Sequence, residues 1–275
     1  MDVRFSSQAA PGRTDNEDGA LTVGNLVAVF DGVTQAPGIE SGCIHGPAWY
    51  VRHLSHQLKA AYSKAPAAPL SDLLALAISG VADQHRTTCD LTSRATPAST
   101  ACLLREGTDQ VEYLVLCDGT LVLDRGGRVE TVTDDRFSRV IADLRRTEPA
   151  YAMASPVKAV TVEKWQYINR PDGYWIAAAD PQAAYEAVTG SIPLNGPDRL
   201  RRAALLTDGA SAAVDQFGLF DWNGLLDILT NAGPAHLIHK VRTAENADRP
   251  ADTRLRYKRH DDATAAICLF EGTDL

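Results

Sequence analysis

The sequence predicts an α+β fold built on antiparallel sheets. Two amphipathic segments, 47–62 and 71–81, follow the first apolar strand and have apolar residues near helical spacing. Short apolar segments separated by turn residues come next, at 99–105, 111–117, 121–124 and 129–132. Helices grouped together and strands grouped together favour antiparallel pairing over the strand–helix alternation of a parallel sheet.

Local signals support these elements. Pro47 suits a first helical turn, where its missing N–H is not needed, and Ser71 is a candidate N-cap. Gly-Gly at 126–127 predicts a hairpin, because primed turns need positive φ. We expect a further hairpin from 160–168 and 174–178. The remaining expected elements are helices at 222–230 and 235–241, a polar loop at 244–260 and a closing strand at 264–270.

The composition is that of an ordinary globular chain, with 45% hydrophobic and 23% charged residues. We expect a single catalytic domain over residues 1–275, a length that can bury a substantial core. The net charge of −8 opposes binding to nucleic acid, because such a surface repels phosphate backbones. No apolar run approaches the roughly 18 residues of a membrane span, so we expect no membrane association and a cytoplasmic location.

The five cysteines are an odd number and have no CxxC spacing. Cys102, Cys117 and Cys268 lie within apolar runs, as buried free thiols in a reducing compartment do. The thiols and histidines show no metal-ligand spacing, and we expect all five cysteines, Cys43 and Cys89 included, to be structural.

Three apolar strands run directly into Asp-Gly. The pairs are Asp31-Gly32, Asp118-Gly119 and Asp208-Gly209. The glycine lets the chain turn sharply and lets its carbonyl approach a ligand closely. A fourth acidic site, Asp261-Asp262, begins the last strand. One such pair alone is usually a turn, whereas four acidic sites at strand ends can converge on one edge of a sheet.

Converging carboxylates predict a cation. Like charges within a few ångströms raise one another's pKa unless a positive charge lies between them. An all-oxygen ligand set favours Mg²⁺, Mn²⁺ or Ca²⁺ over zinc. Upstream of the first strand, Arg13 is suited to bidentate phosphate binding, and Glu17 and Asp18 to orienting metal-bound water. The alternative for this segment is a solvated, charged loop.

In chain order, these motifs resemble those of the metal-dependent protein phosphatases of the type 2C (PPM) family, especially its compact bacterial members. Arg13 lies five residues before Asp18, as in the family's R-x-x-N-E-D segment. The other matches are VFDG at 29–32, Ser-Thr at 99–100, CDG at 117–119, LTDG at 206–209 and DDAT at 261–264. Each motif is short, but six in the same order cover almost the whole chain.

This resemblance implies a four-layer αββα sandwich of two antiparallel sheets flanked by helices. It also implies that Asp31 bridges two Mn²⁺ or Mg²⁺ ions, with the Gly32 carbonyl on one of them. Asp208 and Asp261 would bind the other ion, and Asp118 matches the acid that holds a third ion in bacterial members. Arg13, Glu17 and Asp18 complete the implied site, with Glu17 beside the metal ions.

The implied activity is hydrolysis of phosphoserine and phosphothreonine in proteins, with a water that bridges two metal ions as the nucleophile. A small phosphorylated metabolite is the alternative substrate. A metal-binding regulatory pseudophosphatase is the alternative from another functional class. The sequence gives no indication of the oligomeric state.

The sequence departs from the family pattern after Gly32, where a Gly-rich segment that contains or leads to a histidine is replaced by VTQAPG. His45 and His260 are the candidate proton donors, and His260 is better placed because it adjoins Asp261. For His45 the ordinary interpretation is a polar residue before a helix. Residues 134–156 correspond to a flap beside the active site, with an expected helix at 137–144. Its Arg145 and Arg146 would either attract an anionic substrate or form a solvated helix end.

Overall fold

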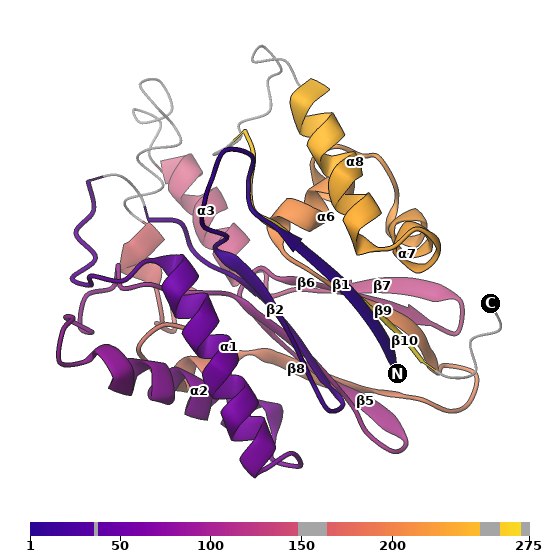
Figure 1. The fold of residues 1–275 in the computed structure, drawn as a ribbon, viewed down its shortest axis with the longest axis horizontal. Coiled ribbons are helices and arrows are strands. Elements are labelled where there is room, and N and C mark those ends of the chain that lie inside the picture. Colours follow the sequence, from indigo (N-terminus) through magenta and orange to yellow (C-terminus); the bar gives the residue numbers. More distant parts are fainter. Residues whose placement is uncertain (36–37, 148–163, 248–258, 271–275) are drawn as a thin grey trace.

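The fold is described here from a computed structural model of the chain, which describes residues 1–35, 38–147, 164–247 and 259–270. Two five-stranded antiparallel sheets stack face to face, and helices cover the outer face of each sheet (Figure 1). This arrangement confirms the antiparallel α+β fold that the sequence predicts and the four-layer αββα sandwich that the family resemblance implies.

The first sheet has the strand order β1-β10-β9-β6-β7, and the second has the order β2-β3-β4-β5-β8. The first sheet consists of β1 (Asp2–Gln8), β10 (Ala263–Leu269), β9 (Leu200–Leu206), β6 (Thr120–Arg125) and β7 (Arg128–Val132). The second consists of β2 (Asp18–Val23), β3 (Leu26–Asp31), β4 (Ala101–Glu106), β5 (Gln110–Leu116) and β8 (Val188–Pro193). Every pair of neighbouring strands is antiparallel, so strand starts and strand ends alternate along each edge.

Two helices cover the second sheet and three cover the first. The two are α1 (Pro47–Lys64) and α2 (Leu70–His85). The three are α6 (Asp208–Asp215), α7 (Trp222–Asn231) and α8 (Pro234–Ala247). Three further elements lie between β7 and β8 in the chain. They are the helix α3 (Arg136–Thr147) and two 3₁₀ turns, η1 (Lys164–Tyr167) and η2 (Pro181–Glu186). No helix in the described ranges is both long and apolar enough to cross a membrane.

Apolar side chains fill the space between each pair of layers. Val29, Cys102 and Leu205 belong to the cluster between the two sheets. Phe30 and Leu54 belong to the cluster under α1 and α2. Successive residues of β3 therefore point to opposite faces, and both faces are buried. This two-sided burial fixes the end of β3, where Asp31 lies.

Most predicted elements are confirmed, including the expected helices at 47–62, 71–81, 222–230 and 235–241 and the closing strand. The Gly-Gly hairpin is confirmed too, since both glycines have positive φ, 54° and 82°. The N-cap of α2 is Pro69 rather than Ser71. In the expected loop 244–260, α8 continues to Ala247, and residues 248–258 lie outside the described part of the chain.

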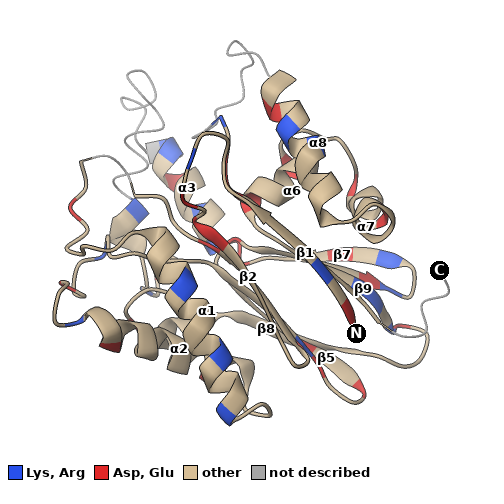
Figure 2. Cartoon of the chain, viewed as in Figure 1, with Lys and Arg blue, Asp and Glu red and all other residues tan. Residues whose placement is uncertain are grey.

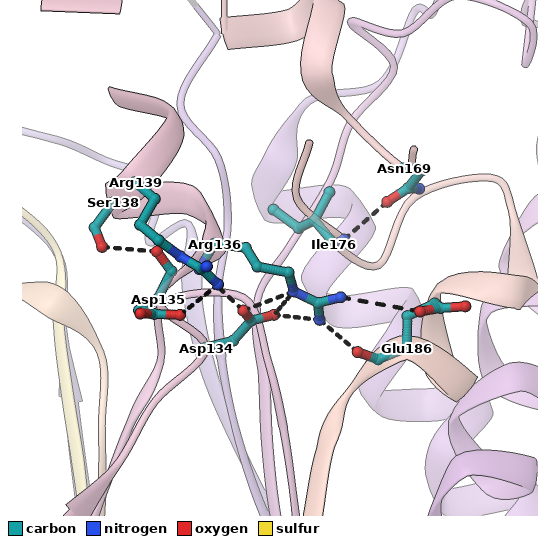
Figure 3. A network of polar contacts seen from close by, with 8 residues as sticks. All are labelled: Asp134, Asp135, Arg136, Ser138, Arg139, Asn169, Ile176 and Glu186. Carbon is teal, nitrogen blue, oxygen red and sulfur yellow. Dashed lines mark hydrogen bonds and ion pairs between the residues drawn. The ribbon is translucent and has the colours of Figure 1, made fainter. Parts of the chain in front are cut away.

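The predicted hairpin from 160–168 and 174–178 is wrong where the structure describes it. Residues Lys164–Tyr167 form a 3₁₀ turn, and Ile168 and Tyr174 form a single parallel bridge. A Cβ on Gly173 would lie 1.9 Å from the Tyr167 carbonyl oxygen, so only a glycine fits at this turn. Instead, the Asn169 side chain accepts a hydrogen bond from the Ile176 backbone N–H at 2.8 Å (Figure 3). β5 pairs with β4 on one side and with β8 on the other, and the sequence does not predict β8.

Candidate active site

The predicted aspartates lie at strand ends of both sheets, on one side of the sandwich. In the second sheet, Asp18 at the start of β2 is the register partner of Asp31 at the end of β3. In the first sheet, Asp208 follows β9, and Asp261 precedes β10, the antiparallel neighbour of β9. Figure 2 shows acidic residues at the start of β2 and in the loop before it, while basic residues are scattered over this view.

Asp31 interacts electrostatically with every other acid of this group. Burial raises the pKa of the Asp31 carboxyl well above its usual range, and repulsion from the nearby acids raises it further. Those acids are, in decreasing order of effect, Asp208, Asp18, Asp261 and Asp118. Five acids from five separate segments of the chain thus interact at this place, four of them from the acidic sites whose convergence the sequence analysis expects. We name them the acidic cluster.

Asp18 joins the two sheets. Its Oδ2 accepts a hydrogen bond of 2.8 Å from the hydroxyl of Thr207, the residue that precedes Asp208. Burial raises the pKa of Asp18 well above its usual range, the Thr207 hydrogen bond opposes that shift, and Asp208 and Asp262 add repulsion. Asp18 therefore fixes the position of Asp208 relative to Asp31 through Thr207.

Gly32 is a glycine for a steric reason. A Cβ at this position would lie 2.5 Å from the Glu17 carbonyl oxygen and 3.0 Å from the Pro47 Cβ. The Gly32 N–H donates to the same Glu17 carbonyl at 3.0 Å. Only a residue without a side chain allows the loop before β2 to approach the end of β3 so closely.

Asp262, to which the sequence analysis gave no role of its own, anchors the loop that carries Arg13. Its side chain is buried and accepts backbone hydrogen bonds of 2.6 Å from both Ala10 and Glu17. These two residues are the ends of the loop, so one carboxylate holds both ends against the start of β10. The Asp-Asp pair is the feature of the sequence that could have indicated this role. Its first member, Asp261, belongs to the acidic cluster, and its second, Asp262, holds the loop.

Arg13 is the cation of the site. Its guanidinium forms an ion pair of 3.0 Å with Glu17 and is 41% exposed, so it remains accessible to a ligand. Burial lowers the Arg13 pKa, but Glu17, Asp262 and Asp261 outweigh that effect and the net shift is upward. Glu17 also accepts a hydrogen bond from the Thr34 hydroxyl. The side chain of Glu17 is thus shared between Arg13 and the segment after Gly32.

Asp118 approaches the cluster from the end of β5. The preceding residue, Cys117, has a φ of 65°, which turns the chain sharply at this point. Burial raises the pKa of the Asp118 carboxyl, and Lys164 opposes that shift. The Cys117 carbonyl accepts a long hydrogen bond of 3.4 Å from the N–H of Asp134, which links this turn to the start of α3.

The start of α3 is held by a network of charged groups (Figure 3). Arg136 binds the buried Asp134 carboxylate with two nitrogens, at 2.8 Å and 2.6 Å, and it also donates to the Glu186 carbonyl oxygen. The predicted helix in this segment is confirmed as α3. Arg146 pairs with Asp143 on the same helix, and the rest of the segment, 148–156, lies outside the described residues.

The two candidate histidines lie in different surroundings. The His260 Nδ1 is 2.8 Å from a carboxylate oxygen of Glu245 on α8, and Arg242 binds the same carboxylate at 2.9 Å. Glu245 therefore holds the His260 ring through Nδ1, and His260 directly precedes Asp261 in the chain. The His45 ring is stacked on Trp49, with centroids 3.9 Å apart, and its Nδ1 is 3.5 Å from the sulfurs of Cys43 and Cys89.

The acidic cluster has the chemistry of a site for hard cations. Its donors are carboxylates, with the Gly32 backbone beside them, and hard divalent ions such as Mg²⁺ and Mn²⁺ prefer oxygen. The only group of side chains in the described ranges whose ligand atoms all lie within 4.8 Å of one another is a different one, Cys43, His45, His85 and Cys89. The more open acidic cluster suits ions that keep several water ligands.

No protein-family model and no curated protein matches the sequence. Solved structures do match over nearly the whole chain. The catalytic domain of the serine/threonine protein phosphatase PstP in complex with two manganese ions is 16% identical, with a TM-score of 0.58, and the match covers 97% of this chain and 96% of that one. The chain has the fold of these phosphatases.

Two further structures agree. Serine/threonine phosphatase Stp1 from Staphylococcus aureus is 15% identical with a TM-score of 0.59, covering 99% of this chain and 96% of that one. The PPM Ser-Thr phosphatase MsPP from Mycobacterium smegmatis, in complex with cacodylate, is 18% identical with a TM-score of 0.56, covering 98% of both chains. At these identities the likeness establishes the fold alone.

Proposed function

We propose that this protein is a metal-dependent phosphomonoester hydrolase that acts on phosphoserine and phosphothreonine in proteins. The observation that carries the proposal is the acidic cluster itself: four acids from four other segments raise the pKa of Asp31, and Asp262 holds the loop that carries Arg13. Solved structures of protein phosphatases, one of them with two manganese ions, share the fold that creates this cluster.

The acidic cluster fits two Mn²⁺ or Mg²⁺ ions, held by Asp31, Gly32, Asp208 and Asp261, with Asp118 available to a third. When bound, such ions supply a water of lowered pKa and neutralise charge on the phosphoryl oxygens. Glu17 and Asp18 hold the surrounding groups in place, Asp18 through Thr207. Arg13 binds the substrate phosphate from the solvent side, since its guanidinium is partly exposed.

His260 is the proposed proton donor to the leaving oxygen. Its Nδ1 is occupied by Glu245, which fixes the ring and leaves Nε2 as the nitrogen that exchanges a proton. A general acid matters most when the leaving group is a poor one. We expect His260→Ala to lower turnover of an alkyl phosphate about 100-fold and that of p-nitrophenyl phosphate less than about threefold. Equal losses on both substrates would argue against this role.

The direct test is hydrolysis of p-nitrophenyl phosphate with Mn²⁺. We expect activity that EDTA abolishes and that Asp208→Ala removes, while Asp215→Ala, at the other end of α6, keeps it. Full activity of the Asp208→Ala protein would refute the site. Binding of Mn²⁺ without turnover of any substrate would refute the enzyme and favour a regulatory pseudophosphatase.

The segment after Gly32 is the reason to keep a second substrate class, because its sequence, VTQAPG, departs from the family pattern. Small phosphorylated metabolites are the alternative substrates. Turnover of phosphoserine and phosphothreonine peptides against a metabolite panel decides between the two. We further propose that residues 1–275 form one catalytic domain and act in the cytoplasm, where free thiols stay reduced.

A further inference from the structure

Two cysteines and two histidines meet at one point of the surface loops. The ligand atoms of Cys43, His45, His85 and Cys89 all lie within 4.8 Å of one another. The Cys43 sulfur is 3.5 Å from the His45 Nδ1, 3.4 Å from the His85 Nδ1 and 2.9 Å from the Cys89 sulfur, and both cysteines are free. We call these four residues the thiol–imidazole cluster.

The four residues come from two segments that are built to meet. Cys43 and His45 lie in the loop between Gly32 and α1, whereas His85 ends α2 and Cys89 follows one turn later, with its N–H bonded to the His85 carbonyl at 2.9 Å. The N–H of Asp90 donates to the Gly42 carbonyl at 2.8 Å and ties the segments together. Gly42 has a φ of +70°, and a Cβ there would lie 3.1 Å from the Ser93 Cβ.

We propose that this cluster binds a structural Zn²⁺ ion, with Cys43, His45, His85 and Cys89 as its four ligands. Two thiolates and two imidazoles are a ligand set typical of tetrahedral structural zinc, and four protein ligands leave no open position for a substrate. The donors are softer than the carboxylates of the acidic cluster, so the two sites select different metals.

The distances agree with this geometry. Zn–S bonds of about 2.3 Å and Zn–N bonds of about 2.0 Å place a sulfur and a nitrogen of one tetrahedron about 3.5 Å apart. The sulfur–nitrogen distances here are 3.4 to 3.5 Å. The two sulfurs, 2.9 Å apart, would separate by about 0.9 Å to reach the spacing of two zinc ligands.

His85 gives independent support. Its ring is only 1% exposed, its Nδ1 faces the Cys43 sulfur, and its Nε2 has no hydrogen-bond partner within the described residues. A buried imidazole whose only polar contact is a thiol is costly, because buried polar groups normally form strong bonds. A bond from Nδ1 to zinc supplies one. The backbone N–H of His45 also donates to the Cys43 sulfur, with a nitrogen–sulfur distance of 3.4 Å. Such a donor would stabilise the negative charge of a thiolate.

The ion would brace the candidate active site from outside. The loop that carries Cys43 and His45 starts at Gly32, and the loop after Cys89 leads to Ser99, which forms a bridge with Gly32. The next residue, Thr100, donates its N–H to the Asp31 carbonyl at 2.9 Å. A bound zinc ion would therefore link, at their far ends, two segments that both contact the end of β3. Each thiol releases its proton to solvent when it binds the ion.

The test is metal analysis of the protein as purified from cells grown with zinc. We expect about one zinc ion per chain in the wild-type protein and in His56→Ala, which changes an exposed histidine of α1 outside the cluster. We expect no zinc in Cys43→Ser/Cys89→Ser and less than about half an equivalent in His45→Ala. Zinc-free wild-type protein, or a Cys43–Cys89 disulfide in protein kept under thiol reductant, would overturn the proposal.

Cobalt substitution keeps the test valid if the double variant does not fold. Wild-type protein loaded with Co²⁺ should show the intense visible bands of tetrahedral coordination and a thiolate charge-transfer band. Absence of both bands would refute the site. Removing zinc with a chelator should lower the Tm by about 5 °C or more. Asp31→Asn should retain the zinc and the cobalt spectrum, so the zinc proposal and the proposed activity can fail separately.

Discussion

The acidic cluster and the thiol–imidazole cluster are both built from residues distant in sequence, but in different ways. The acidic cluster is assembled from strand ends, and three of its members stand in Asp-Gly motifs directly after an apolar run. The thiol–imidazole cluster is assembled from one loop and from the end of α2 with the turn after it, and its members lie at Cys-x-His and His-x₃-Cys spacing. The arrangement of the two sheets determines the acidic cluster, and contacts between the loop and the end of α2 determine the thiol–imidazole cluster.

The clusters also differ in what bringing them together costs. Burial raises the pKa of Asp18, Asp31 and Asp118, and repulsion from other members of the acidic cluster adds to it at Asp18 and Asp31, so the acidic cluster opposes folding until a cation binds. Thiols and neutral imidazoles carry no like charge and tolerate contact. We infer that the acidic cluster serves chemistry at the expense of stability, and that the thiol–imidazole cluster serves stability alone.

Asp31→Asn should break this comparison most sharply. The amide keeps the shape of the side chain but removes the central charge of the acidic cluster. We expect kcat with Mn²⁺ to fall about 1,000-fold or more, because metal binding and charge balance are lost together. Without divalent metal, the variant should be more stable than the wild type by about 1 kcal/mol in urea unfolding, since repulsion is relieved. A variant that is both inactive and less stable would contradict the inference.

Arg13→Ala should have the next largest effect. Arg13 is the only cation assigned to phosphate, and its partly exposed guanidinium can bind two phosphoryl oxygens. We expect kcat/KM for a phosphopeptide to fall about 100-fold, with no loss of stability beyond about 0.5 kcal/mol. Arg139→Ala, which removes an exposed ion pair on α3, is the control and should change neither quantity. Activity near that of the control would remove Arg13 from the site.

The sequence predicted an antiparallel α+β fold and the acids at strand ends because both depend on local patterns, whereas the four-layer sandwich was implied by the resemblance to a family. Apolar runs set the strands, and a strand that ends in Asp-Gly places its carboxylate at a sheet edge whatever its neighbours are. Antiparallel pairing then brings Asp261 beside Asp208. The edge strand β8 escaped prediction because its sequence, VTGSIP, holds a glycine and a proline and few apolar residues.

What the sequence could not supply depends on contacts between loops. Cys43 and Cys89 are 46 positions apart, and no periodicity indicates that Gly42 meets Asp90. In the sequence each half of the thiol–imidazole cluster has a short spacing, but neither half alone forms a metal site, so only folding shows that the four residues meet. Asp262 was missed as an anchor for the same reason, since its two partners lie at least 245 positions away.

Asp262→Ala tests how much the loop beside the acidic cluster contributes to stability and to activity. Losing both backbone hydrogen bonds should free the Ala10–Glu17 loop and cost about 2 kcal/mol of stability, because bonds to a buried carboxylate are strong. We expect kcat/KM to fall about tenfold as Arg13 loses its position. Asp262→Asn, which keeps one acceptor oxygen, should lose about half as much stability. An Asp262→Ala protein of normal stability would show that the loop is held by other contacts.

The smallest effect we predict is a dependence of stability on pH in the metal-free protein. The pKa values of Asp18, Asp31 and Asp118 are raised on folding, so the folded chain binds more protons than the unfolded chain above the ordinary aspartate pKa of about 3.9. Stability must then fall as the pH rises from about 4 through the raised pKa values. We expect a loss of about 1 kcal/mol between pH 5 and 7, measured by urea unfolding in EDTA.

Two controls assign this slope to the acidic cluster. Mn²⁺ should flatten the profile, because a cation stabilises the ionised carboxylates and removes the reason to bind protons. Asp31→Asn should reduce the slope even without metal, since it removes the carboxyl at the centre of the repulsion. Cys43→Ser/Cys89→Ser, if it folds, should have a lower stability with the same slope. A slope that disappears in this double variant instead would place the titrating groups in the thiol–imidazole cluster and reverse the roles assigned to the two sites.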